Sequence, residues 1–130
     1  GAILAKKQIP LTENETYTTL EQKLADISGE LLVETLPQFV SGNVRVIPQN
    51  ENDATYTKKF TSDDGFVDVD KDDPLIVEQK IRALNPEPGV WMKRPPAGGG
   101  KRVKLLAAEI MDGKLKITKI QEGGKNPRTP

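Results

Sequence analysis

The feature that most constrains the fold is the run IRALNPEPGVW at residues 81–91. Pro86 disfavours helical backbone angles at Asn85, and Gly89 can adopt angles that other residues avoid. The run therefore predicts a helix that stops abruptly, a tight turn, and a strand that starts at Trp91, the only tryptophan. So short a connection fixes where the helix and the strand lie relative to each other.

A longer helix is predicted near the start of the chain from the spacing of its apolar residues. These recur at steps of three and four, which is typical of one apolar stripe on a helix. The stripe consists of Leu20, Leu24, Ile27, Leu31, Leu32 and Leu36. Thr18 and Glu21 have the spacing of a capping box at the start of this helix. Residues 3–9 and 44–47 are expected to form strands on either side of it.

The remainder of the chain predicts a small barrel-like β domain with one helix. A short strand is expected at 66–69, and Asp73 followed by Pro74 is typical of a helix start. Two longer strands, at 101–110 and 114–120, would be joined by a tight hairpin turn.

The turn between these strands is predicted at Asp112 and Gly113. Alternation places Leu115 and Ile117 toward a core, whereas Ile120 breaks the alternation and indicates a bulge near Lys119. The run PPAGGG at residues 95–100 lacks the Lys-Ser/Thr of a phosphate-binding loop, so we expect an exposed hairpin tip.

Composition limits the chemistry. The 130 residues include neither cysteine nor histidine, which excludes disulfides and the commonest general base. There is neither an apolar run long enough to span a membrane nor a signal-peptide pattern, and we expect a cytoplasmic protein. The cluster of aspartates at residues 63–73 lacks the spacing of a calcium-binding loop, so turn and cap roles are favoured and no metal is expected.

Charge is distributed unevenly although the net charge is zero. Residues 93–130 hold ten Lys or Arg and three Asp or Glu, a net of +7. Such an asymmetry favours a surface that binds a polyanion through phosphate contacts and counterion release. The alternative is a solvated lysine face. Aromatic residues are scarce, so base stacking is not expected, and Trp91 is interpreted as a core anchor rather than a stacking platform.

Several motifs, in this order and at these spacings, resemble the C-terminal part of the methionyl-tRNA formyltransferase family. They are LLVETLP at 31–37, PQ at 48–49, ATY at 54–56, DGFVD at 64–68, the run at 81–91, and IQEGGK at 120–125. In that family a Rossmann-like formyltransferase domain is followed by a linker and an OB-like β-barrel.

The resemblance implies an α+β fold in three parts. Residues 1–48 would be a strand-helix-strand remnant of the Rossmann-like domain, residues 49–60 a linker, and residues 61–130 the OB-like barrel with one helix. Glu87 stands where the family usually has an aromatic residue, and Val69 where a tryptophan is common.

The resemblance also implies a function for the parent enzyme, which transfers a formyl group from 10-formyltetrahydrofolate to initiator Met-tRNA in translation initiation. The family's catalytic Asn, His and Asp lie upstream of the segment that residues 1–4 resemble. This part alone is therefore expected to be inactive, to bind no cofactor, and to support the catalytic domain of the same polypeptide by binding tRNA.

The candidate tRNA-binding residues fall into two groups. Six are in the predicted strands: Lys101, Arg102, Lys104, Lys114, Lys116 and Lys119. The other two, Lys58 and Lys59, lie in the linker, which in the family is beside the groove for the acceptor arm. A plain flexible connector is the alternative for these two. For the whole chain, the alternatives are a structural or self-association module, or part of a related formyltransferase that acts on folate or an amino-sugar nucleotide.

Overall fold

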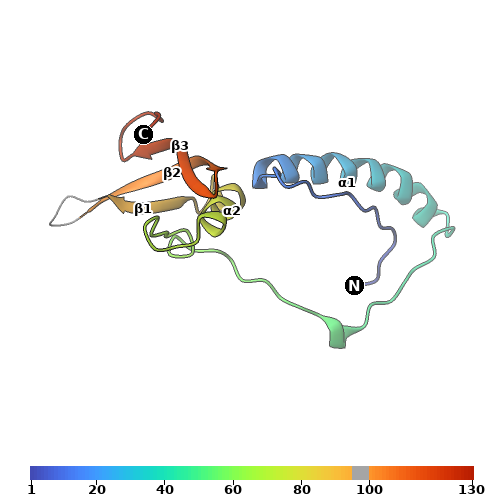
Figure 1. Cartoon of the computed structure of the whole chain (residues 1–130). Helices are drawn as coiled ribbons and strands as arrows, with labels where there is room; N and C mark the ends of the chain where they lie inside the picture. Colours follow the sequence, from blue (N-terminus) through green and yellow to red (C-terminus); the bar gives the residue numbers. More distant parts are fainter. Residues whose placement is uncertain (95–99) are drawn as a thin grey trace. The chain divides into compact units, whose positions relative to one another are not determined.

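The computed structural model describes residues 1–94 and 100–130, with two α-helices, a short 3-10 helix and three strands (Figure 1). Their bounds are α1 Tyr17–Val40, η1 Glu51–Asp53, α2 Pro74–Leu84, β1 Val90–Arg94, β2 Lys101–Met111 and β3 Lys114–Glu122. The fold is α+β, as expected. Most of the predicted hairpin tip at residues 95–100 lies outside the described residues.

The chain divides into two compact units. One consists of Gly1–Glu15 and Thr19–Lys58, and the other of Thr16–Thr18 and Lys59–Pro130. The predicted boundaries at 48 and 60 stay a prediction.

The first unit contains most of α1, from Thr19 onward, and the helix is confirmed but not its predicted cap. Since the helix already begins at Tyr17, Thr18 lies in its first turn and cannot be the capping residue. No residue of α1 is buried, and the side chains of Leu24 and Leu36 are about half exposed. The apolar stripe therefore exists but contributes little burial.

The prediction of strands at residues 3–9 and 44–47 is wrong. Only one antiparallel bridge forms there, in which the Ile3 N–H donates to the Ile47 carbonyl at 2.8 Å and the Ile47 N–H donates back at 3.0 Å. A strand needs a continuous ladder of partners, and prolines that lack an N–H follow both segments. Lys7 instead forms an ion pair with Glu30 of α1 at 2.9 Å.

Local chemistry sets both ends of α2, as predicted. The Asp73 carboxylate accepts from the backbone N–H of Leu75 at 2.8 Å, and Pro74 is the first helical residue. At the other end Asn85 is extended with ψ 141°, and Gly89 has φ +81°. The side chain of Asn85 also donates to the Leu105 carbonyl at 2.9 Å, which ties the end of α2 to β2.

The sheet is antiparallel with strand order β1-β2-β3. Asp112 and Gly113 have φ +51° and +73°, the left-handed angles that a type I′ hairpin turn requires. The β2–β3 register shifts on either side of Ala107, which pairs with Lys119. This irregularity confirms the bulge predicted near Lys119.

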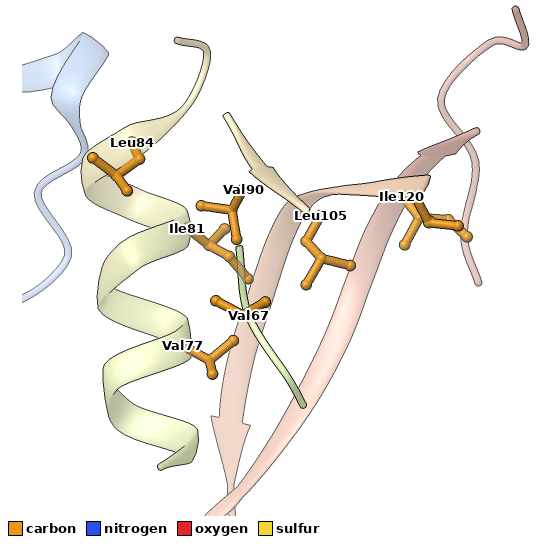
Figure 2. Close-up of a cluster of buried hydrophobic side chains, with 8 residues drawn as sticks. Val67, Val77, Ile81, Leu84, Val90, Leu105 and Ile120 are labelled. Carbon is orange, nitrogen blue, oxygen red and sulfur yellow. The ribbon is translucent and has the colours of Figure 1, made fainter. Parts of the chain in front are cut away.

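One hydrophobic cluster joins α2 to one face of the sheet (Figure 2). It consists of Val67, Val77, Ile81, Leu84, Val90, Val103, Leu105 and Ile120, all buried. The strand predicted at 66–69 is wrong, because only a single parallel bridge, between Phe66 and Trp91, forms there. The OB-like barrel also stays a prediction, since the described strands form a three-stranded sheet.

Trp91 is not a core anchor, which corrects the sequence interpretation. Its neighbour Val90 is fully buried and pairs with Leu105, so alternation turns Trp91 to the opposite face of the sheet. There the Trp91 side chain is only partly buried. The core position expected for the tryptophan is filled by smaller aliphatic side chains.

The aspartates of residues 63–73 cap and brace turns, as predicted. Asp64 accepts from the Thr61 N–H at 2.7 Å, and Asp72 accepts from the Asp68 N–H at 2.9 Å. The hydrogen bond from Lys71 lowers the pKa of Asp68. Nowhere in residues 1–94 or 100–130 does a cluster of His, Cys, Asp or Glu suit a metal ion.

Candidate nucleic-acid interface

The sheet has a second face, opposite α2, which we call the outer face. Strand pairing assigns its residues, because Lys104 pairs with both Trp91 and Gln121, and Lys116 pairs with Glu109. Continuing the alternation along each strand gives the charged and aromatic members of this face. They are Trp91, Lys93, Arg102, Lys104, Glu109, Lys114, Lys116, Lys119 and Gln121.

Five of the eight predicted binding residues share the outer face. They are Arg102, Lys104, Lys114, Lys116 and Lys119, and all five are exposed. Lys101 is also exposed, but it has the same strand parity as the buried Val103. Lys58 and Lys59 are exposed and lie outside the sheet, where the first unit ends and the second begins.

Nine of the ten cations of residues 93–130, all except Lys101, fall into two electrostatic groups. Three surround one carboxylate: Lys125 and Arg128 each lie 2.8 Å from Glu122, and Arg94 lies 3.5 Å from it. By contrast, none of the six outer-face cations, which are Lys93 and the five predicted residues, forms an ion pair within the described chain. The charge available to a ligand is therefore concentrated on the outer face.

Glu122 also holds the C-terminal segment against β3. The hydrogen bond from Lys125 and then that from Arg128 lower the pKa of Glu122 to about 2. The Ile120 and Arg128 backbones exchange two hydrogen bonds of 2.9 Å, and the Gln121 side chain donates to the Lys125 carbonyl at 3.0 Å. These contacts shape the end of the sheet next to the outer face.

A hollow of about 260 Å³ opens at this end of the sheet. Its lining residues are Arg102, Lys104, Gln121, Glu122, Gly123 and Gly124. Two of the predicted binding residues therefore lie in one concave site. Sequence reasoning missed Gln121 and the two glycines, although counting back from the turn at residues 112–113 places Gln121 opposite Lys104.

The outer face also carries an aromatic pair. The rings of Phe66 and Trp91 lie 4.9 Å apart, centroid to centroid, with a tilt of 55°. The guanidinium carbon of Arg102 lies 4.2 Å from the Trp91 ring centroid, which is a cation–π contact. An aromatic platform thus adjoins the cationic surface.

Comparison with known proteins places the chain beside one group of enzymes. It is 34% identical over 122 residues to the methionyl-tRNA formyltransferase of Bartonella tribocorum, which covers 93% of this chain and 39% of that enzyme. It is 35% identical to the enzyme of Kosmotoga olearia, over 86% of this chain and 34% of that enzyme. The Levilactobacillus brevis enzyme is 32% identical, over 95% and 37% respectively.

The predicted resemblance to methionyl-tRNA formyltransferases is confirmed. The chain spans roughly two fifths of the length of these curated relatives. No protein-family profile matches the chain. None of the described helices is both long and apolar enough to cross a membrane.

Proposed function

We propose that this chain is the tRNA-binding part of a methionyl-tRNA formyltransferase. The outer face binds the phosphate backbone of initiator Met-tRNA, and the catalytic domain of the same polypeptide transfers a formyl group from 10-formyltetrahydrofolate. The observation that carries the proposal is the gathering of six exposed cations, without ion pairs in the described chain, on one face of one sheet.

The physical basis is the release of counterions. Each cation that neutralises a phosphate frees a condensed ion, so affinity falls steeply as salt rises. The opposite face of the sheet is closed by α2 and the buried cluster, which leaves the outer face free to meet a ligand. The similarity to formyltransferases that act on methionyl-tRNA supports tRNA as the polyanion.

The proposal includes the domain arrangement and location inferred from the resemblance. Residues 1–48 are the end of a Rossmann-like domain, residues 49–60 a linker in which Lys58 and Lys59 contact phosphate, and residues 61–130 an OB-like domain. This part of the enzyme binds no cofactor, does not transfer formyl groups unaided, and acts in the cytoplasm.

The test is tRNA binding by the full 130-residue chain across a salt series. The variant replaces Lys104, Lys114, Lys116 and Lys119 by Gln, and the control is Lys71→Gln, in the turn before α2. With about eight phosphate contacts, six from the outer face and two from Lys58 and Lys59, the logarithm of the association constant should fall against the logarithm of salt with a slope of about −6. The fourfold variant should retain about four contacts and a slope of about −3, and the control should match the wild type.

Absence of wild-type binding at low salt would overturn the proposal. A fourfold variant that binds as well as the wild type would show that the outer face is not the contact surface. Binding of a folate or an amino-sugar nucleotide in place of tRNA would favour a related formyltransferase.

A second candidate function is a structural module that associates through α1. The half-exposed Leu24 and Leu36 favour it, because an apolar stripe of this kind gains free energy when it is covered. Sedimentation of the wild type and of a Leu24→Glu/Leu36→Glu variant distinguishes the two. Self-association that this variant abolishes, in a chain that does not bind tRNA, would support the structural role.

A further inference from the structure

Trp91 is fixed in place from several directions. Its backbone N–H donates to the Gly65 carbonyl at 2.9 Å, and its own carbonyl accepts from the Val67 N–H at 3.0 Å. The indole N–H donates to the Ser62 carbonyl at 2.8 Å, and the Phe66 ring packs beside it. The ring is therefore a rigid surface on the outer face.

The Arg102 guanidinium lies over the Trp91 ring. The guanidinium carbon is 4.2 Å from the Trp91 ring centroid. A guanidinium that stacks by its plane keeps the N–H groups along its edge available, and these match the two oxygens of a phosphate. No ion pair occupies Arg102 in the described chain. The stack orients the group before any ligand arrives.

The hollow provides a place for a phosphate beside this guanidinium. Arg102 and Lys104 both line it, so two cations without ion pairs in the described chain meet there. A Cβ atom built on Gly123 or Gly124 would meet no neighbour within 4 Å, so the space around this backbone is open. Glu122 supplies the carboxylate in this lining, and its charge is already balanced by ion pairs with Lys125 and Arg128.

We propose that Arg102, oriented by Trp91, and Lys104 form a clamp for a single phosphodiester of RNA in this hollow. The inference rests on the proposed function and refines it: one phosphate is held in fixed geometry, whereas Lys114, Lys116 and Lys119 attract the backbone diffusely. Arg102 is then a binding residue, and Trp91 is a positioning residue.

The test separates the geometry of the Arg102 side chain from its charge. Arg102→Lys keeps the charge but removes the planar fork and its stacking. Lys71→Arg, in the turn before α2 and outside the outer face, is the control for an exchange between Lys and Arg. We measure affinity for initiator tRNA at one moderate salt concentration and the fluorescence of Trp91, the only tryptophan. Inorganic phosphate alone is a second ligand.

With a clamp, Arg102→Lys should bind tRNA about tenfold more weakly, close to Arg102→Gln, and Lys71→Arg should bind as the wild type does. Bound tRNA should change the Trp91 fluorescence of the wild type but not of Arg102→Lys.

Wild-type affinity of Arg102→Lys, with intact salt dependence, would overturn the clamp and leave the proposed function standing. Loss of tRNA binding by the wild type itself would overturn both. A fluorescence change with inorganic phosphate but not with tRNA would overturn the assignment to RNA.

Discussion

Gly65 offers a sharp test of how the aromatic platform is built. This buried glycine packs against the turn that follows α2, and a Cβ added to it would lie 2.0 Å from the Gly89 carbonyl oxygen. The obstacle is backbone rather than a flexible side chain. Gly65→Ala must therefore push the 62–67 segment and β1 apart by more than ~1 Å to reach an ordinary contact distance.

The magnitude follows from the hydrogen bonds that this movement breaks. Three join the segment to Trp91: from Trp91 N–H to Gly65, from Val67 N–H to Trp91, and from the indole N–H to Ser62. At about 1 kcal/mol each, their loss costs about 3 kcal/mol. That is a large share of the ~5–10 kcal/mol by which a small folded unit is stable.

The assay is urea unfolding followed by Trp91 fluorescence and by circular dichroism. Gly123→Ala is the control, because a Cβ at that position meets no atom within 4 Å. We expect a loss of about 3 kcal/mol in the unfolding free energy of Gly65→Ala and a change below about 0.5 kcal/mol for Gly123→Ala. A Gly65→Ala protein as stable as the wild type would refute the close packing.

Three further predictions follow from the packing and the charges. Leu105→Ala, at a fully buried site, should lower the unfolding free energy by about 2–5 kcal/mol in urea titrations, whereas Leu75→Ala at an exposed site of α2 should change it little. Folding lowers the pKa of Glu122 from 4.5 to about 2, so the stability that the ionised Glu122 gives to the fold should be complete above pH 4.5 and lost as the pH falls toward 2. Glu122→Gln should remove this part of the acid sensitivity, measured by unfolding titrations at several pH values. Hydrogen exchange should be faster in α1, which has no buried residue, than in β2, and equal protection of both would contradict this.

Short-range signals in the sequence predict the elements whose ends depend on local chemistry. Asp73 with Pro74 starts α2, and Asp112 with Gly113 forms the hairpin turn, because a cap and a left-handed turn need only nearby backbone. The run at 81–91 likewise predicts the end of α2. None of these features requires knowledge of distant contacts.

Features that depend on long-range pairing are predicted less well. Residues 3–9 alternate too weakly to form a ladder, and only Ile3 finds a partner. Trp91 is assigned to the wrong face because the sequence does not reveal that Val90 takes the core position opposite Leu105. A large aromatic residue indicates burial only when the register is known.

In the candidate site, too, nearby residues could be predicted from the sequence and long-range contacts could not. The sequence identifies a basic segment, but it counts Lys125 and Arg128 together with Lys116 and Lys119. Only the fold shows that Lys125 and Arg128 form ion pairs with Glu122. It also brings Arg102, Lys104 and the glycines of residues 123–124 into one hollow, which composition alone does not reveal.

The most direct test of the account is chemical footprinting of lysine amines in the presence and absence of initiator tRNA. Acetylation, read by mass spectrometry, should fall at Lys104, Lys114, Lys116 and Lys119 when tRNA is bound and should be unchanged at Lys71. Equal protection of Lys71 and the outer-face lysines, or protection confined to other surfaces, would contradict the assignment of the outer face as the tRNA-binding surface.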